Sequence, residues 1–175
     1  MFKISKLKHS ILYNINVKKG FMKVAIKEAL KGESAGEIPV GAVIICDGKV
    51  IAKAHNKTSF LKDPTAHAEI LAIRKAAKKI GDWRLNNCEI YVTLEPCPMC
   101  ASAIMLARIK KVIFGTYDKD YGAFGSKTNL KNTFPSLNPS LEIKGGVLEE
   151  QCSQILKGFF NKLRNKYNIR KRRGG

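Results

Sequence analysis

The chain has 175 residues, of which 45% are hydrophobic, and it carries a formal net charge of +18 at pH 7. This length suits one domain with an ordinary core. No apolar run approaches the roughly 18 residues of a membrane-spanning helix, so we expect no membrane-embedded protein. The charge favours polyanionic partners, chiefly nucleic acid or an anionic membrane face, but a general bias toward lysine would produce the same charge without any partner.

The N-terminal stretch carries only basic charges until Glu28. Asparagines interrupt its apolar run at 11–17, so a signal peptide is not expected. Transit peptides also lack acid, but they are usually rich in arginine and serine rather than lysine and asparagine. We therefore expect residues 1–19 to form a poorly ordered basic extension of a cytoplasmic protein, with organellar targeting as the alternative.

Apolar spacing and turn residues predict the secondary structure along the chain. Residues 21–31 have the periodicity of an amphipathic helix, Asp47-Gly48 is a hairpin signal between two β-rich runs, and Asp63-Pro64-Thr65 suits a helix start. The expected elements are helix 21–31, strands 40–46 and 49–54, loop 55–63, helix 63–80, strand 89–94, helix 99–109, strand 111–115, loop 117–140, strand 141–144 and helix 148–167.

The order strand, helix, strand, helix, strand predicts parallel βαβ units with helices covering the sheet, which is the α/β class. No repeat or low-complexity linker interrupts this order. We expect one domain over residues 20–168 and a basic tail over residues 169–175.

Two short motifs stand at predicted helix starts, T-A-H-A-E at 65–69 and E-P-C-P-M-C at 95–100. Cys97 and Cys100 are three residues apart, so they share one face of a first turn, where free N–H groups and the helix dipole stabilise thiolates. His67 lies near the start of the helix predicted from residue 63, which also follows a strand and a loop. Both helix N-termini would face the carboxyl edge of the sheet, where open α/β sheets place their sites.

One imidazole and two thiolates suit zinc, and a catalytic zinc site leaves the fourth position to water. Glu69 is then interpreted as a base beside that water, whose pKa zinc lowers from about 15.7 to about 7. The remaining thiols lie in or beside apolar runs and are expected in the core; they are Cys46, Cys88 and Cys152. The alternatives are a redox pair for C-x-x-C and ordinary surface residues for His67 and Glu69.

H-A-E at 67–69 followed by P-C-P-M-C at 96–100 is the signature of the zinc-dependent nucleobase deaminases. Over residues 21–164 the chain resembles the bacterial-type tRNA-specific adenosine deaminases. The matching stretches are I-P-V-G-A-V-I (38–44), H-N (55–56), D-P-T-A-H-A-E (63–69), Y-V-T-L-E-P-C-P-M-C-A-S-A-I (91–104), R-I (108–109), V-I-F-G-T-Y-D (112–118), G-A-F-G-S (122–126) and F-F-x-x-L-R (159–164). The G-A-x-G-S stretch and the aspartate after F-G distinguish the tRNA-specific adenosine deaminases, which this chain resembles, from guanine, cytosine and dCMP deaminases. The long basic N-terminus and Pro139, where many relatives have histidine, depart from the pattern.

The resemblance implies a cytidine-deaminase-like, three-layer α/β/α fold with a central mixed five-stranded sheet. It also implies one zinc ion per chain, bound by His67, Cys97 and Cys100, with Glu69 as the proton shuttle for a zinc-activated hydroxide. The implied reaction is hydrolytic deamination of adenosine to inosine at the wobble position of an arginine tRNA anticodon, by a homodimer. A single-stranded loop suits this reaction because its bases are already partly unstacked.

The resemblance also assigns the residues around the base. Asn56 is expected to hydrogen-bond the flipped base together with the Ala68 backbone N–H, and Asp118 to contact the sugar beside the target. The expected apolar walls of the pocket are Ile38, Val40 and Leu94. The expected RNA contacts on the final helix are Phe159, Phe160, Lys162 and Arg164.

Two other functions keep the same motifs. A free nucleobase or nucleoside deaminase, of the guanine or cytosine type, would use every catalytic residue, but its small substrates need no large positive field. A structural zinc module that binds RNA without chemistry would need a fourth protein ligand and would have no use for Glu69.

Overall fold

Helices and strands alternate along the chain much as the sequence predicts. The computed structural model describes the backbone of residues 2–173 and the side chains of residues 16–166. The elements are α1 (Phe2–Ser34), β1 (Gly41–Cys46), β2 (Lys49–His55), α2 (Thr58–Leu61), α3 (Ala68–Ile80), β3 (Cys88–Leu94), α4 (Pro98–Leu106), β4 (Lys111–Thr116), α5 (Leu130–Thr133), β5 (Glu142–Lys144) and α6 (Glu149–Arg173).

The strands form a mixed five-stranded sheet with the order β2-β1-β3-β4-β5. β1 is antiparallel to both β2 and β3, whereas β3, β4 and β5 are parallel. The hairpin between β1 and β2 turns at Asp47 and Gly48, whose φ angles are both positive, at 49° and 73°. Positive φ at both central residues is characteristic of the tight type I′ turn, which matches the twist of the paired strands.

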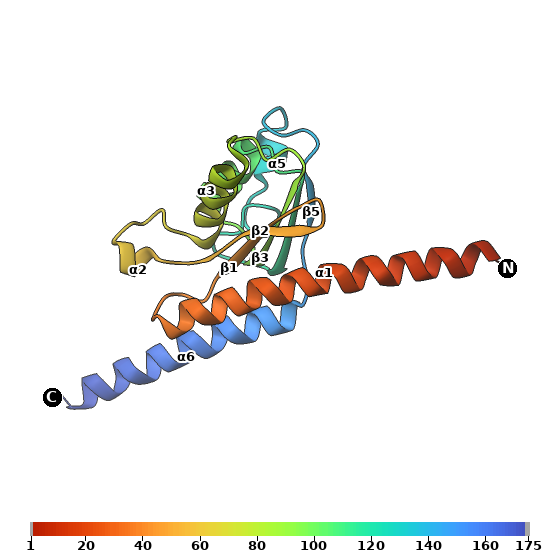
Figure 1. The fold of residues 1–175 in the computed structure, drawn as a ribbon. Helices are drawn as coiled ribbons and strands as arrows, with labels where there is room; N and C mark the ends of the chain where they lie inside the picture. Colours follow the sequence, from red (N-terminus) through yellow and green to blue (C-terminus); the bar gives the residue numbers. More distant parts are fainter. Residues whose placement is uncertain (1, 174–175) are drawn as a thin grey trace.

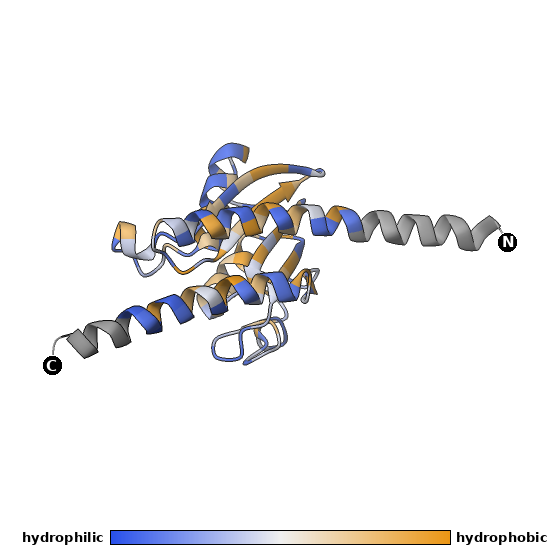
Figure 2. Ribbon diagram, turned by 90° about the horizontal axis from the view of Figure 1, so that it is seen from below, coloured by the Kyte–Doolittle hydropathy of each residue, from blue (hydrophilic) through white to orange (hydrophobic). Residues whose placement is uncertain are grey.

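Helices cover both faces of the sheet, giving the expected three-layer α/β/α architecture (Figure 1). One layer contains α3 and α4, and the other contains α1 and α6, which contact each other. Because successive strand residues point to opposite faces, Ala42 and Ile44 join the core under α3 and α4. Val43 and Ile45 join the core under α1 and α6. Viewed from below, α1 and α6 carry hydrophobic and hydrophilic residues in alternating patches, as helices that cover a sheet do (Figure 2).

Two glycines allow the helices of the second layer to approach the sheet closely. A Cβ added to Gly41 would collide with the backbone of α1 at Ala25 and Ala29, and one added to Gly115 would collide with Cys152 of α6. Any side chain at these positions would therefore push a helix away from the sheet.

Several element boundaries differ from those predicted. The helix predicted over 21–31 is part of the longer α1, and the final helix α6 continues to Arg173. The side chains of residues 2–15 lie outside the described part. That residues 1–19 form a poorly ordered extension therefore stays a prediction. Two short helices, α2 and α5, lie within the segments predicted as loops 55–63 and 117–140.

The start of α3 was predicted wrongly, at Asp63-Pro64-Thr65. Asp63 Oδ1 instead accepts hydrogen bonds from the backbone N–H of Thr65 at 2.8 Å and from its hydroxyl at 2.7 Å. This side-chain turn competes with helix formation, and α3 begins only at Ala68. Its predicted end is confirmed, because Gly81 adopts the left-handed conformation (φ 81°) that closes a helix.

Helix α4 ends at Leu106 rather than at the predicted Ile109. Arg108 has a φ of 57°, which a right-handed helix cannot contain. Among the described residues, no helix combines the length and the hydropathy needed to cross a membrane.

Candidate active site

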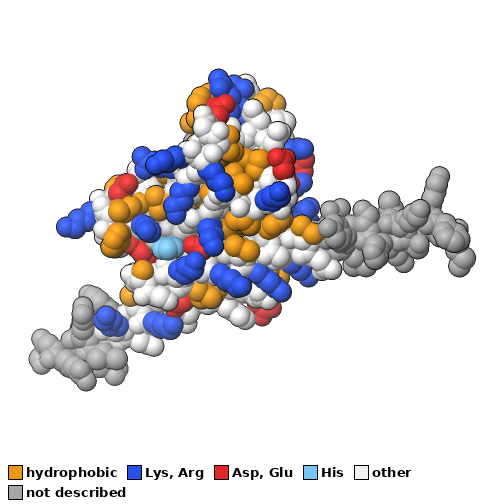
Figure 3. Space-filling model, in the orientation of Figure 1, with side chains coloured by type: hydrophobic (Ala, Val, Ile, Leu, Met, Phe, Trp, Pro, Cys, Tyr) orange, Lys and Arg blue, Asp and Glu red, His pale blue; other side chains and the backbone are white. Residues whose placement is uncertain are grey.

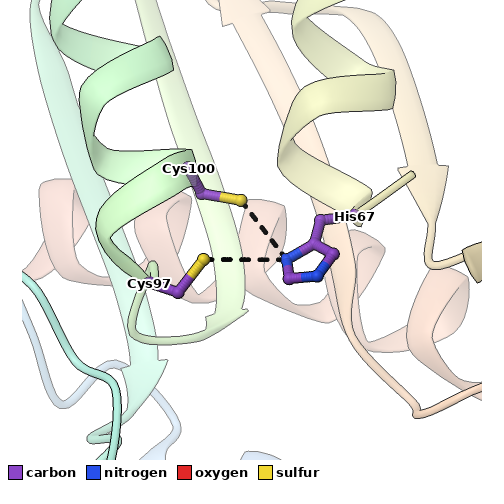
Figure 4. Close-up of side chains that lie close together, drawn as sticks. All are labelled: His67, Cys97 and Cys100. Carbon is purple, nitrogen blue, oxygen red and sulfur yellow. Dashed lines mark hydrogen bonds between the residues drawn. The ribbon is translucent and has the colours of Figure 1, made fainter. Parts of the chain in front are cut away.

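The N-termini of α3 and α4 carry the candidate ligands. His67 is the N-cap of α3 and Cys97 the N-cap of α4, both with extended backbones. An N-cap side chain points off the end of its helix rather than along its side, so the two helix ends can present their side chains to one point. Figure 4 shows His67 and the two cysteines of the α4 terminus, Cys97 and Cys100, directed toward one another.

The spacing of these three side chains fits a tetrahedral zinc site. His67 Nδ1 lies 3.5 Å from Cys100 Sγ and 3.7 Å from Cys97 Sγ, and all three ligand atoms lie within 4.8 Å of one another. Tetrahedral coordination with Zn–S of about 2.3 Å and Zn–N of about 2.0 Å separates sulfur from nitrogen by about 3.5 Å. The donor set and its spacing therefore fit zinc.

The three spare thiols lie elsewhere, as expected. Cys88 and Cys152 are buried and Cys46 is half-buried, and none of them joins the metal-binding group found among the described residues. Burial raises the pKa of both Cys88 and Cys152 to about 12. These thiols are thus protonated at neutral pH, and they pack in the two hydrophobic cores of the protein.

Cys97 is the more acidic thiol of the site. A hydrogen bond from Cys100, assisted by His67, lowers the pKa of Cys97 to about 4 despite its partial burial. The same pairing raises the pKa of Cys100, and the Cys97 contact raises the pKa of His67. The Cys97 thiolate, stabilised by hydrogen bonds from Cys100 and His67, is a preformed soft ligand for a metal cation.

Glu69 lies in the first turn of α3 and is 3% exposed. Burial raises the pKa of its carboxyl group to about 7, and its Oε2 has no hydrogen-bond partner among the described residues. Buried carboxylate oxygens are normally satisfied, so an orphan beside three metal-ligand side chains indicates a missing polar partner. A carboxyl group with a pKa near 7 can both accept and donate a proton at neutral pH.

Asn56 is held beside this site. It is 7% exposed, and its Oδ1 accepts a hydrogen bond from the Ala68 backbone N–H at 2.9 Å. This bond fixes the side-chain amide at the N-terminus of α3 and leaves its two N–H donors free for another acceptor. In this structure the Ala68 N–H thus orients Asn56. That Asn56 and Ala68 contact the base stays a prediction.

These groups open into a cavity of about 940 Å³. Its lining includes two members of the metal group, His67 and Cys97, together with Glu69. It also includes most of the residues expected around the substrate, namely Ile38, Val40, Asn56, Leu94, Asp118, Phe160 and Arg164. The volume suits a nucleoside-sized group. The structure therefore gathers around one cavity residues that are far apart in sequence.

Two expected RNA contacts lie away from the cavity. Phe159 is 7% exposed and packs edge-on against Phe160, which makes it a supporting residue. Lys162 Nζ lies 2.8 Å from Glu33 Oε1 on α1, so this ion pair joins α6 to α1. Neither residue lines the cavity, whereas Phe160 and Arg164 do.

Sequence reasoning assigned no role to two buried carboxylates at the cavity. Glu37 is 3% exposed and accepts hydrogen bonds from the backbone N–H groups of Ser59 and Phe60, at 3.2 and 2.8 Å. It thereby closes the N-terminus of the short helix α2 over the cavity rim. Glu95, directly before Pro96-Cys97, accepts hydrogen bonds from backbone N–H groups of the segment 118–126. Only the adjacency of Glu95 to the cysteine motif marked it in the sequence.

Basic residues are spread over the face shown in Figure 3, between hydrophobic patches. The cations that line the cavity are Lys119, Lys157 and Arg164, and acidic side chains lie among them. Of these three cations, Lys157 and Arg164 lie on α6, so this helix brings positive charge to the cavity.

Comparisons with known proteins agree with this site. The model of the MafB19-like deaminase family matches residues 15–164. The chain is 48% identical over 146 residues to the tRNA-specific adenosine deaminase of Bacillus subtilis, covering 83% of this chain and 90% of that protein. It is 49% identical over 148 residues to the tRNA-specific adenosine deaminase of Aquifex aeolicus, covering 85% and 97%.

A solved structure from a study of A-to-I editing by tRNA:A34 deaminases at the wobble position of transfer RNA is 40% identical. It covers 78% of this chain and 99% of its own, with a TM-score of 0.73. A guanine deaminase from Bacillus subtilis is 36% identical and covers 66% of this chain and 88% of its own, with a lower TM-score of 0.54.

The three-layer fold and the His-Cys-Cys group define a deaminase of the cytidine-deaminase-like superfamily. Identities of 48% and 49% across almost the full length of two bacterial relatives narrow the class further. The chain belongs to the tRNA-specific adenosine deaminase family.

Proposed function

We propose that this protein converts adenosine to inosine at the wobble position of a tRNA anticodon, with release of ammonia. The observation that carries the proposal is the buried Glu69 carboxyl group with a free Oε2, beside three side chains spaced as zinc ligands. Relatives described as tRNA-specific adenosine deaminases support the choice of substrate.

His67 Nδ1 and the sulfurs of Cys97 and Cys100 would hold one zinc ion per chain. A bound zinc ion would supply a Lewis acid that makes a water molecule acidic at neutral pH. The helix N-termini favour the thiolate form of the cysteines. His67, as an N-cap, keeps its ring at the cavity wall.

Glu69 would carry the protons of the reaction. Its carboxylate takes a proton from the attacking water and passes it to N1 of adenine. It then takes the remaining proton from the hydroxyl group added at C6 and delivers it to the leaving amine, so that water and adenosine give inosine and ammonia. A pKa of about 7 lets one group serve as base and then as acid. Its burial keeps bulk water from exchanging with these protons.

The base would lie between apolar walls, with its polar edge at Asn56. Val40 is buried and Leu94 half-buried, while Ile38 is 44% exposed at the cavity mouth. The free N–H groups of Asn56 can donate to a ring nitrogen of a flipped purine. Asp118 lies on the same cavity, where its backbone or carboxylate can meet the adjoining ribose.

A free-base deaminase of the guanine type is the second candidate, because a guanine deaminase shares 36% identity. Ammonia release measured on an anticodon stem-loop, free adenosine, guanine and cytosine separates the two functions. We expect ammonia and inosine from the stem-loop alone. Efficient turnover of guanine or cytosine, with no reaction of the stem-loop, would transfer the assignment to that class.

A structural zinc module is disfavoured by the arrangement of the cysteines. Cys46→Ala, Cys88→Ala and Cys152→Ala are expected to keep one zinc per chain, while Cys97→Ser and Cys100→Ser lose it. Atomic absorption on the purified variants gives the stoichiometry. Loss of zinc from any of the first three variants would identify a fourth protein ligand and a closed site.

We further propose a homodimer, as the resemblance implies. Helix α2 offers apolar surface beside the cavity, because Phe60 is 75% exposed and Leu61 48% exposed. Light scattering should report twice the chain mass, and Phe60→Ser with Leu61→Ser should shift the protein toward the monomer. A native dimer that is insensitive to both changes would place the interface elsewhere.

A further inference from the structure

Glu95 is a buried acid without a cation. It is 2% exposed, and none of the ion pairs among the described side chains includes it. A buried carboxylate is costly unless hydrogen bonds replace its lost hydration. The partners of Glu95 therefore reveal what its charge organises.

All of its hydrogen-bond donors come from one segment, residues 118–126, between β4 and α5. Glu95 Oε2 accepts from the Asp118 N–H at 3.2 Å and from the Ser126 hydroxyl, and Oε1 accepts from the N–H groups of Phe124 at 3.0 Å and Ser126 at 3.1 Å. A carboxylate has about four lone-pair sites, so these four bonds use its accepting capacity. None is left for a substrate.

The segment also fits closely around the carboxylate. A Cβ added to Gly122 would collide with the Glu95 carboxylate and with the carbonyl of Asp118. Only glycine therefore allows the chain to pass this acid at this distance. Gly122 is the first residue of the G-A-F-G-S stretch, so this stretch packs closely around the Glu95 carboxylate.

The same segment forms one side of the cavity. Asp118, Lys119, Asp120 and Tyr121 line it, and Tyr121 is 69% exposed. Asp118 Oδ1 in turn accepts hydrogen bonds from the N–H groups of Asp120 and Tyr121, at 3.0 and 3.1 Å. A chain of hydrogen bonds thus runs from Glu95 through Asp118 to Asp120 and Tyr121, which line the cavity.

We propose that Glu95 is a positioning residue that fixes the 118–126 segment against the Cys97 terminus of α4 and so determines how the enzyme binds the nucleotides flanking the target adenosine. Glu95 does not touch the substrate; it acts through Asp118. The inference rests on the proposed function, because the flanking nucleotides exist only in a polynucleotide substrate.

Glu95→Gln tests this role with little change of shape. The amide oxygen can still accept from Phe124 and Ser126, but the amide NH₂ would face the Asp118 N–H, donor against donor. We expect the KM for an anticodon stem-loop to rise about tenfold with a much smaller change in kcat. Amide hydrogen exchange should accelerate at Asp118 more than at Phe124.

A further variant and a control keep the test decisive. Ser126→Ala removes a single bond to the carboxylate and should raise KM by about threefold, which serves if Glu95→Gln folds poorly. Glu28→Gln alters another buried carboxylate (5% exposed), one that is bonded to Lys31 and lies outside the cavity. It should leave KM at the native value.

The double variant with Asp118→Ala separates positioning from general stabilisation. If Glu95 acts through Asp118, the KM of the double variant should equal that of Asp118→Ala, because the pair is coupled. The inference would be overturned if the two substitutions multiplied their effects on KM in the double variant. It would also be overturned if both Glu95→Gln and Ser126→Ala kept the native KM. Absence of stem-loop turnover by the native enzyme would instead overturn the proposed function.

Discussion

Glu69 combines burial, an unpartnered oxygen and a position beside the metal group. Glu69→Gln keeps the shape but cannot shuttle protons, so inosine formation should fall by a factor of about 10² to 10⁴. Zinc content should stay at one per chain, because Glu69 is not among the proposed ligands. Glu150→Gln, on the exposed start of α6, is the matched control and should keep the native rate. A Glu69→Gln enzyme with near-native turnover would rule out this mechanism.

Cys97 gives a pH-dependent test in the metal-free protein. Its pKa is lowered to about 4 in the fold, so the folded protein loses this proton at lower pH than the unfolded chain does. The thiolate therefore stabilises the fold increasingly as the pH rises from about 4 toward 9, and this contribution is lost as the pH falls through 4.

Alkylation by iodoacetamide measures the thiolate directly. At pH 6 the metal-free protein should be modified first at Cys97, while Cys88 and Cys152, whose pKa is about 12, should stay unreacted. Added zinc should protect Cys97. An alkylation rate at Cys97 that rises only around pH 8 to 9 would contradict the hydrogen-bonded pairing with Cys100.

At the residue scale, local motifs predicted the metal group and the position of Glu69 beside it, because the spacing within each motif is set within a single helix turn. His67, Cys97, Cys100 and Glu69 each lie within two residues of a helix start. Glu95 could not be predicted in the same way, since its role depends on a segment more than twenty residues further along the chain.

At the element scale, α6 presents two cations to different surroundings. Arg164 lines the cavity, whereas Lys162 pairs with Glu33 of α1. Arg164→Ala should weaken binding of an anticodon stem-loop and flatten the plot of log affinity against log salt by about 0.7 to 0.9, the value for one phosphate contact. Lys162→Ala should leave both unchanged. Equal losses from the two variants would show that α6 contributes only diffuse charge.

The elements were predicted well where a pattern is local and less well where side chains intervene. The hairpin at Asp47-Gly48 and the end of α3 at Gly81 follow from backbone conformations that these residues favour. The start of α3 depends on the Asp63 side chain, which bonds Thr65 and delays the helix. That delay makes His67 an N-cap, which brings its imidazole to the metal group.

At the scale of the whole molecule, the sequence predicted an α/β fold, and the resemblance added the mixed order of the sheet. Strand alternation accounts for both cores. The hairpin signal predicted that β1 pairs with β2, but the antiparallel pairing of β1 with β3 had no signal in the residues alone, because it depends on how α3 crosses the sheet. The +18 charge likewise indicated polyanions without locating them.

The most direct test of the central claim compares two RNA stem-loops that differ only in the position of one adenosine. One carries it at the wobble position of the anticodon, and the other carries it in the paired stem, where the base is stacked. With zinc-loaded native enzyme, mass spectrometry should find inosine and stoichiometric ammonia from the first RNA and neither product from the second. Equal conversion of both RNAs, or conversion of neither while guanine is deaminated, would contradict a wobble adenosine deaminase.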